Sequence, residues 1–366
     1  MSTLLVTGGA GFIGANFVLH WRRLRSVDRI VVLDALTYAG NRSNLAPLAA
    51  DGAFEFVHGD ICDAALVNDL FKKWEFDRVV HFAAESHVDR SILSPGVFLR
   101  TNVQGTHTLL EAALAAWKSS LDGRRFHHIS TDEVYGSLEP NEPPFTELSR
   151  YDPKSPYAAS KAASDFLVRS YAHTYGLPAL ITNCSNNYGP YQFPEKLIPL
   201  VILNSLMGKS LPIYGDGLNV RDWLHVEDHC AALAAVLDRG QVGETYNIGG
   251  GQEVPNIELV GLLCDEIDRR FVADGKAAAR FPDCPAARGG SCRELMTFVK
   301  DRPGHDRRYA ICADKLFHEL DFRARTALGE GLAMTIDWYL ANEEWWRPIQ
   351  SGAYRDWVKQ QYGAAS

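Results

Sequence analysis

The tripeptide Thr131-Asp132-Glu133 follows an apolar run that is typical of a buried strand. Further along, Tyr157 and Lys161 lie four residues apart in a stretch that we predict to be helical. Residues with this spacing share one face of a helix, so the phenol and the ammonium can meet. A Tyr–Lys pair is suited to hydride chemistry, and the adjacent acid and base predict an internal redox reaction coupled to the loss of water.

Each of these patterns has a simpler interpretation. The two acids could be solvated loop residues, and Tyr–Lys pairs arise by chance on exposed helices. Their order favours a site, because the acids follow a predicted strand and directly precede the helix of Tyr157. Two adjacent carboxylates can take opposite roles where their surroundings separate their pKa values. We expect Lys161, like an oxidised nicotinamide, to lower the pKa of Tyr157.

A glycine-rich turn, Gly8-Gly9-Ala10-Gly11-Phe12-Ile13-Gly14, connects the first predicted strand to the first predicted helix. Its glycines permit a tight turn, close approach of the backbone to a pyrophosphate, and close packing of helix on strand. Asp34, at the end of the next strand, can accept hydrogen bonds from an adenosine ribose and would repel a 2′-phosphate. The pattern predicts NAD as cofactor, in preference to NADP; the alternative is a glycine turn in an unrelated α/β protein.

Further strand ends should border the same cofactor, because ligands of open α/β sheets bind at the carboxyl ends of the strands. The segments concerned are Asp60-Ile61 and Ala83-Ala84-Glu85-Ser86. Asn186-Asn187 ends the sixth predicted strand, at the junction of the two domains. Asp60 could instead be a helix cap or turn residue. Glu85 could form a structural salt bridge, and we assign it no catalytic role.

The first half of the chain alternates apolar strands with helices, which is typical of a Rossmann-type, doubly wound parallel sheet covered on both faces. The predicted strands are Leu4–Thr7, Ile30–Asp34, Phe54–Val57, Val79–Ala83, Phe126–Ser130 and Ala179–Asn183. The predicted helices are Phe12–Arg25, Ala64–Trp74, Gly96–Trp117 and Pro156–Tyr175. Ser155, Pro156 and Gly176 mark the two ends of the last helix.

After residue 187 the pattern becomes irregular, which indicates a smaller α/β substrate domain over 188–366, with a segment near 222–250 returning to the first domain (1–187). We expect the Ala-, Gly-, Arg- and Pro-rich residues 273–300 to form a surface insertion. Scattered cations in this half would suit a diphosphate if they converged in one cleft, and would otherwise be ordinary surface charges.

Composition excludes several classes of function. A net charge of −8 and a pI near 5.8 disfavour nucleic-acid and anionic-membrane partners. The sequence has no apolar run long enough to span a bilayer and no signal-type N-terminus. Seven scattered cysteines, without a C-x-x-C pair, predict reduced thiols, a cytoplasmic protein and no metal site.

Taken together, the motifs resemble the extended short-chain dehydrogenase/reductase superfamily and, within it, the dTDP-glucose 4,6-dehydratases. The matching stretches include TGGAGFIG from Thr7, LDALTYAGN from Leu33, HFAAESHVDRS from His81, STDEVYG from Ser130, SPYAASKAASD from Ser155, NCSNNYGPYQFPEKLIP from Asn183, GDGLNVRDWLHVEDH from Gly215 and DRPGHDRRYAI from Asp301.

The resemblance implies a mechanism and a role for each catalytic residue. Tyr157 takes the proton of the sugar's carbon 4 hydroxyl as a hydride passes to NAD, Thr131 hydrogen-bonds that oxygen, and Lys161 tunes Tyr157 and holds the nicotinamide ribose. Glu133 then removes the carbon 5 proton, Asp132 protonates the departing carbon 6 hydroxyl, and the hydride returns to carbon 6. The product would be dTDP-4-keto-6-deoxy-glucose.

The resemblance also implies the binding residues. For NAD they are Gly8, Gly11, Phe12, Ile13, Gly14, Asp34, Leu36, Thr37, Asp60, Ile61, Ala83, Ala84, Thr101, Tyr157, Lys161 and Asn187. For the nucleotide sugar they are Ser86, Thr131, Asn186, Lys196, Leu197, Pro212, Tyr214, Arg221, Asn256, Arg302, His305 and, less directly, Tyr354. The resemblance also implies a homodimer joined through a bundle of two helices per subunit, which here are Gly96–Trp117 and the helix that carries Tyr157.

Three alternatives remain at this stage. A nucleotide-sugar 4-epimerase needs no acid–base pair for carbons 5 and 6, so Asp132 and Glu133 count against it. A dehydratase of another nucleotide sugar would leave similar diphosphate contacts. A non-catalytic NAD-sensing protein should lack Tyr157, Lys161 or Glu133, and all three are present.

Overall fold

The computed structural model describes residues 2–273, 275–301 and 304–350. Its centre is a seven-stranded, wholly parallel sheet with strand order β3-β2-β1-β4-β5-β6-β10. The strands are β1 (Thr3–Thr7), β2 (Arg29–Asp34), β3 (Phe54–His58), β4 (Arg78–His81), β5 (Arg125–Thr131), β6 (Ala179–Cys184) and β10 (Thr245–Ile248). They read as apolar runs because the central strands are buried on both faces. The predicted doubly wound sheet is confirmed.

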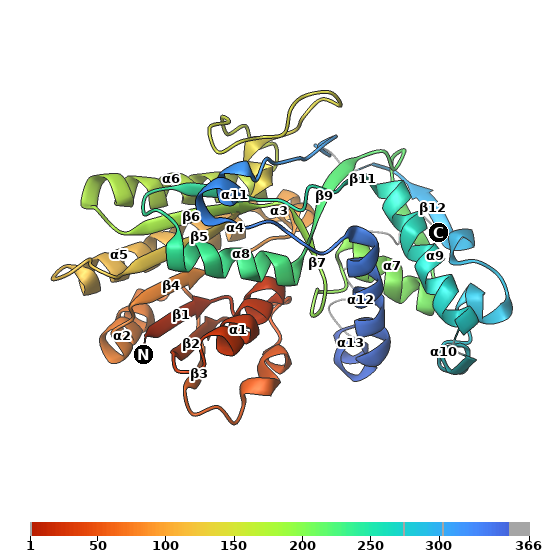
Figure 1. Ribbon diagram of the computed structural model, residues 1–366, viewed down its shortest axis with the longest axis horizontal. Coiled ribbons are helices and arrows are strands. Elements are labelled where there is room, and N and C mark those ends of the chain that lie inside the picture. Colours follow the sequence, from red (N-terminus) through yellow and green to blue (C-terminus); the bar gives the residue numbers. More distant parts are fainter. Residues whose placement is uncertain (1, 274, 302–303, 351–366) are drawn as a thin grey trace.

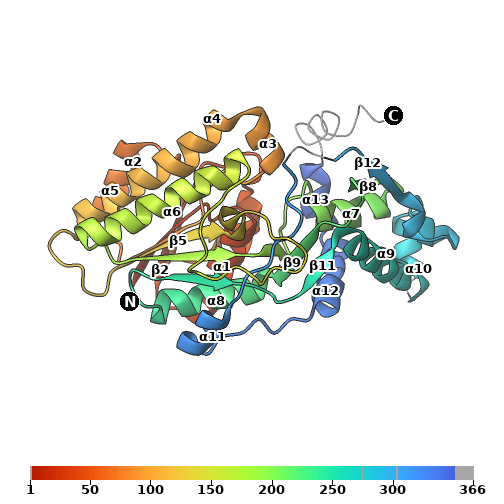
Figure 2. The same ribbon diagram turned by 90° about the horizontal axis from the view of Figure 1, so that it is seen from above.

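Helices cover both faces of this sheet (Figures 1 and 2). One face packs against α1 (Phe12–Leu24), α8 (Val226–Arg239) and α11 (Asp314–Leu320). The other packs against α2 (Ala64–Trp74), α5 (Thr106–Trp117) and α6 (Pro156–Tyr175). Helix α6 begins and ends as predicted: the Ser155 side chain caps it by accepting from the Ala158 amide, and Gly176 ends it in the left-handed conformation.

The predicted helix over 96–117 is continuous from Pro95 to Trp117, but part of it is π-helical. The chain forms α3 (Val88–Leu93), the short α4 (Pro95–Phe98) and a π-helical segment, η2 (Leu99–Gly105), before α5 begins. At Gly105 an added Cβ would lie 2.4 Å from the Ile61 side chain, so only glycine permits this close approach. π-Helical turns often mark functional sites, and η2 carries Thr101.

The second half of the chain builds a smaller lobe with its own apolar core, seen on the right of Figure 1. Its strands are β7 (Asn186–Tyr188), β8 (Leu211–Tyr214), β9 (Val220–His225), β11 (Glu253–Pro255) and β12 (Met296–Val299). Its helices are α7 (Leu197–Leu206), α9 (Asn256–Ala273), α10 (Gly275–Arg280), α12 (Leu328–Ala341) and α13 (Glu343–Ile349). Short 3₁₀ turns occur in both halves of the chain. They are η1 (Arg42–Leu48) and η3 (Asp132–Tyr135) in the first half, and η4 (Pro285–Arg288) and η5 (Cys292–Leu295) in the second.

Segment 226–248 supplies α8 and β10 to the large sheet, although it lies between β9 and β11 in sequence. The domain division at residue 187 stays a prediction. Residues 273–300, expected at the surface, contribute four buried side chains to the core of the smaller lobe: Ala277, Phe281, Cys284 and Cys292. These widely spaced residues pack into one apolar cluster with α9, so the segment is not a purely surface insertion.

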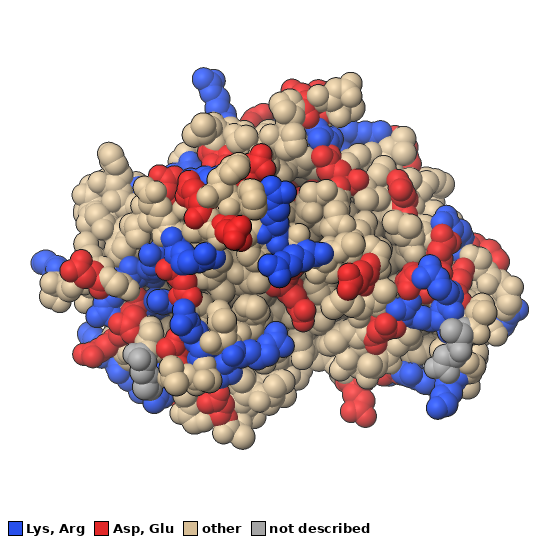
Figure 3. Space-filling model, in the orientation of Figure 1, with Lys and Arg blue, Asp and Glu red and all other residues tan. Residues whose placement is uncertain are grey.

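The face of the molecule shown in Figure 3 intersperses acidic and basic side chains. In the described part of the chain, no helix has the length and apolar character needed to cross a membrane.

Candidate active site

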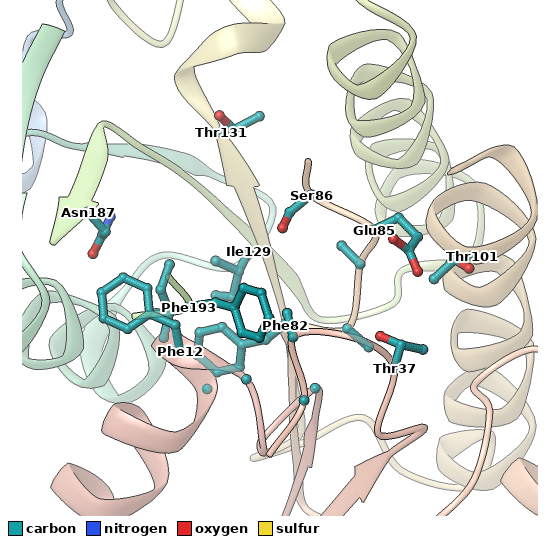
Figure 4. A pocket seen from close by; sticks show the side chains of 18 of the residues that line it. Phe12, Thr37, Phe82, Glu85, Ser86, Thr101, Ile129, Thr131, Asn187 and Phe193 are labelled. Atoms are coloured by element: carbon teal, nitrogen blue, oxygen red, sulfur yellow. The ribbon is translucent and has the colours of Figure 1, made fainter. Parts of the chain in front are cut away.

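A pocket opens at the carboxyl ends of the parallel strands, where the order of the sheet reverses between β1 and β4. All but one of the residues expected to hold NAD line it: Gly8, Gly11, Phe12, Ile13, Gly14, Asp34, Thr37, Asp60, Ile61, Ala83, Ala84, Thr101, Tyr157, Lys161 and Asn187. The exception is Leu36, which lies beside the pocket with its backbone in the left-handed region (φ 49°). Figure 4 shows Thr37, Thr101 and Glu85 on one side of the pocket and Phe12, Phe193 and Asn187 on the other.

The glycine turn leaves its backbone open to a diphosphate. A Cβ on Gly8 would lie 2.6 Å from the Ala83 nitrogen, and a Cβ on Gly14 would lie 2.3 Å from the Gly8 oxygen. Gly11 caps α1 without a side-chain hydrogen bond, so the first amides of the helix need another acceptor. These features fit a dinucleotide, whose pyrophosphate accepts hydrogen bonds at such a helix start.

Asp34 is held in place by the same turn. Its Oδ2 accepts from the Ala10 amide at 2.9 Å and its Oδ1 accepts from the Leu36 amide at 2.8 Å. Each carboxylate oxygen keeps a further acceptor position. Asp34 can therefore receive ribose hydroxyl groups without giving up the contacts that orient it, which fits NAD.

Thr131, Asp132 and Glu133 lie where β5 runs into the 3₁₀ turn η3, and all three line the pocket. The Thr131 hydroxyl accepts from the Glu133 amide and donates to Asp132 Oδ1, both at 3.3 Å. Asp132 is only 2% exposed, and its Oδ2 has no hydrogen-bond partner among the described residues. Burial, followed by the nearby Glu133, raises the pKa of Asp132 well above its usual value, so this carboxyl can serve as an acid.

Tyr157 and Lys161 also line the pocket, and both are buried. Burial, and then Glu133, raises the pKa of Tyr157 well above its usual value. The direction is opposite to the lowering that we expected from sequence. Burial lowers the pKa of Lys161 to about 8, and the Lys161 Nζ donates to the Ile129 carbonyl at 2.7 Å. Desolvation therefore outweighs the lysine's charge at Tyr157 in the protein alone.

Sequence reasoning missed Cys184, which ends β6 and lines the pocket. The Cys184 thiol donates to the Ser130 carbonyl at 3.5 Å. Burial raises the pKa of this thiol to about 12, so it lines the pocket as a neutral group. Its position at the carboxyl end of a predicted strand was the available signal.

A second missed group joins three distant segments at the pocket. The Arg90 guanidinium lies 3.6 Å above the Tyr38 ring, and its Nε lies 3.8 Å from Glu195 Oε2. Burial raises the pKa of Glu195 to about 7. Only the position of Glu195 next to Lys196 signalled this group, because the pairing itself is a tertiary contact.

The expected substrate residues divide into two sets. Ser86, Thr131, Asn186 and Lys196 line the pocket, and the Lys196 Nζ donates to the Ser86 carbonyl at 3.3 Å. The other described residues lie outside the pocket lining: Leu197 at the start of α7, Pro212 and Tyr214 on β8, Arg221 on β9, Asn256 at the start of α9, and His305. Arg302 and Tyr354 lie outside the described residues.

Two of these outer residues have definite surroundings. The Tyr214 ring meets the His305 ring edge-on, with centroids 6.1 Å apart. Arg221 is 5% exposed and donates to the Val220 and Asp306 carbonyls at 2.7 and 2.9 Å. Its guanidinium lies 4.2 Å above the Tyr309 ring and tends to lower the pKa of Asp132, so it lies near that carboxyl.

Comparison with known proteins shows which family the chain resembles. Residues 5–335 match the family model described as GDP-mannose 4,6 dehydratase. The dTDP-glucose 4,6-dehydratase of Xanthomonas campestris is 54% identical over 97% of this chain and 98% of its own length. The enzyme of that name from Shigella flexneri is 51% identical over 98% of both chains.

Solved structures similar to this chain support the same family. The dTDP-glucose 4,6-dehydratase of Streptomyces venezuelae, solved with NAD and TYD bound, has a TM-score of 0.84 and 50% identity, covering 95% of this chain and 99% of its own. A UDP-glucose 4-epimerase of Thermotoga maritima shares the fold with a TM-score of 0.78 but only 26% identity, over 93% of this chain and 99% of its own. The chain therefore belongs to the dTDP-glucose 4,6-dehydratase family.

Proposed function

We propose that the chain converts dTDP-glucose to dTDP-4-keto-6-deoxy-glucose with NAD as its cofactor. One observation carries this function: a buried Asp132 whose raised pKa suits an acid adjoins the partly exposed Glu133, at the mouth of a dinucleotide pocket that also holds Tyr157 and Lys161. Loss of water across two carbons needs one group to take a proton and another to give one.

The NAD site is formed by the glycine turn, Asp34 and the strand ends that line the pocket. NAD, when bound, supplies the hydride acceptor for carbon 4 and the hydride donor for carbon 6. Lys161 lies on the same face of α6 as Tyr157, and its ammonium would hold the nicotinamide ribose. Thr101 and Asp60 also line the pocket.

The protein's own residues move the protons. Tyr157 removes the proton from the carbon 4 hydroxyl while the Thr131 hydroxyl hydrogen-bonds that oxygen. The ketone formed at carbon 4 acidifies the neighbouring carbon 5 proton, which Glu133 removes as the general base. Asp132, protonated through burial, gives its proton to the carbon 6 hydroxyl, which leaves as water.

The nucleotide sugar extends from this centre towards the smaller lobe. Ser86, Asn186 and Lys196 hold the part next to the catalytic residues, since they line the same pocket. Residues of the smaller lobe (Leu197, Pro212, Tyr214, Arg221, Asn256 and His305) hold the diphosphate and the nucleoside. Support for this half of the site comes from the resemblance to the family and from the cations on these elements.

The protein acts as a homodimer. Support comes from apolar side chains exposed on the helices expected to form the bundle: Val97 and Leu99 on α4 and η2, and Phe166 and Tyr175 on α6, each at least half exposed. These helices lie together at one edge of the molecule in Figure 2. Light scattering tests the dimer: the variant with both Val97→Asp and Phe166→Asp should be a monomer.

The seven cysteines are free, and the sulfurs of Cys284 and Cys292 lie 3.6 Å apart without a disulfide bond. Free thiols support a reducing compartment such as the cytoplasm.

Mass spectrometry of products from dTDP-, UDP- and GDP-glucose and GDP-mannose tests the substrate. We expect dTDP-glucose to lose one water and to be preferred over the other sugars. A product of unchanged mass would instead identify a 4-epimerase. Preference for a uridine or guanosine sugar would contradict the assignment of the base while leaving the dehydration in place.

A further inference from the structure

Four residues spaced by four, Tyr157, Lys161, Asp165 and Arg169, form a row along α6. Residues with this spacing lie one above the other on a helix. Asp165 therefore sits between two cations, one turn deeper than Lys161. It is fully buried, and it does not line the pocket.

The Asp165 carboxylate is surrounded by side-chain donors. Its Oδ2 accepts from the Ser130 hydroxyl and from the Tyr151 hydroxyl, both at 2.9 Å, and the Asn183 amide nitrogen lies 3.5 Å away. Its Oδ1 lies 3.2 Å from His128 Nε2. Arg169 in turn donates to the Tyr151 hydroxyl at 2.8 Å. A buried carboxylate is tolerated when it is paired and hydrogen-bonded in this way.

Apart from Glu133, which we propose as the general base, the other groups near Lys161 carry little charge at neutral pH. Those that face it from the surrounding elements are His81 on β4, His128 on β5, Cys184 on β6, Tyr157 on α6, and Asp132 and Glu133 at the end of β5. Burial lowers the pKa of His128 to about 4 and that of His81 well below its usual value.

Three further groups near Lys161 are also neutral. Burial raises the pKa values of Cys184, Tyr157 and Asp132, so these groups stay protonated. Asp165 differs: burial acts to raise its pKa, but the contacts with His128, Lys161 and Ser130 outweigh burial and leave it below the usual value. An ionised carboxylate thus lies on the protein side of Lys161.

We propose that Asp165 is a positioning residue whose buried negative charge keeps the Lys161 ammonium protonated while Lys161 serves the reaction. Its contact with Ser130 also ties the helix to β5, whose next residue is Thr131. The proposal rests on the proposed role of Lys161, because a charged Lys161 attracts the deprotonated Tyr157 and a neutral amine does not.

The pH profile of the reaction tests the role of the charge. Asp165→Asn keeps the shape and removes the charge, so Lys161 should lose its proton at lower pH. An opposite charge within a few ångströms shifts a pKa by about 1–3 units, and the alkaline limb of kcat/KM should move down by that amount. Tyr151→Phe removes a hydrogen bond from the same carboxylate but keeps its charge. Its alkaline limb should stay at the wild-type pH.

A double-mutant cycle on stability provides a readout that needs no turnover. Lys161→Met leaves Asp165 as an uncompensated buried anion, and Asp165→Asn leaves Lys161 as an uncompensated buried cation. The double variant should therefore unfold at higher denaturant concentration than Lys161→Met alone. If Asp165→Asn fails to fold, recovery of folding in the double variant gives the same support.

Three results would overturn the proposal. They are an alkaline limb that does not move in a folded Asp165→Asn, an equal movement in Tyr151→Phe, and a double variant that is no more stable than Lys161→Met. Absence of dehydratase activity in the wild-type protein would instead overturn the proposed function, and the stability cycle would be unaffected by it.

Discussion

The Thr131 hydroxyl donates to one oxygen of the Asp132 carboxyl at 3.3 Å, while the other oxygen is buried without a hydrogen-bond partner among the described residues. An ionised carboxylate in this position would be poorly solvated, so the protonated form is favoured. The protein thus keeps a proton available on the residue that we propose protonates the leaving hydroxyl group.

Asp132→Asn should slow dehydration by about 10²–10⁴-fold, the usual effect of losing a general acid. It should also stabilise the protein at pH 7. The pKa of Asp132 in the folded state is raised above the 3.8 of the unfolded chain, so this group costs stability above pH 3.8 and costs nothing below it. Thermal unfolding at pH 7 and near pH 3.5 checks this: a variant that melts at or below the wild-type temperature at pH 7 would contradict it.

Glu133→Gln should separate oxidation from elimination. The amide keeps the shape of the side chain but cannot take the carbon 5 proton, and a lost general base costs about 10²–10⁴-fold in rate. Mixing with dTDP-glucose should therefore give an NADH absorbance while the 4-keto-6-deoxy product forms slowly. Exchange of the carbon 5 proton with heavy water should fall in parallel. Dehydration at the normal rate would remove Glu133 from the mechanism.

Tyr157→Phe is the matched comparison, because it removes the group that acts during oxidation and keeps the ring. Little NADH absorbance should appear on mixing. If the signal is lost equally in Glu133→Gln and Tyr157→Phe, Glu133 belongs to the oxidation step or to the general structure of the site.

Asp34→Ala should weaken NAD binding about 10–100-fold, because a hydrogen bond to a charged group contributes about 1.5–3 kcal/mol. The preference for NAD over NADP should narrow as the repulsion of a 2′-phosphate disappears. Asp34 also accepts from two backbone amides, so calorimetric titration needs Asp34→Asn as a control that keeps one carbonyl acceptor. Unchanged cofactor preference in Asp34→Ala would place Asp34 away from the ribose.

The sequence predicted the elements that carry strong local signals. Helix α6 has the predicted bounds because Ser155, Pro156 and Gly176 act through nearby backbone groups. The strands of the large sheet were found because burial on both faces makes each an apolar run. The residues predicted for catalysis and most of those predicted for the cofactor line one pocket, since parallel strands bring their carboxyl ends to one edge.

What the sequence did not show depends on contacts between distant segments. The Tyr38–Arg90–Glu195 group joins two loops and helix α3, and no local sequence pattern predicts it. The π-helical segment that carries Thr101 includes Gly105, which lies close to the Ile61 side chain, and that contact joins distant parts of the chain. The raised pKa of Tyr157 reflects the balance between burial and charge, which spacing along a helix does not give.

The pathway of one hydrogen tests the proposed function most directly. The protein, as purified with its cofactor, is supplied with dTDP-glucose carrying deuterium at carbon 4, and the product is examined by mass spectrometry and NMR. We predict a product that has lost one water and carries the deuterium at carbon 6, with no accumulation of NADH. Deuterium appearing in released NADH, or remaining at carbon 4 of a sugar of unchanged mass, would contradict an internal oxidation, dehydration and reduction.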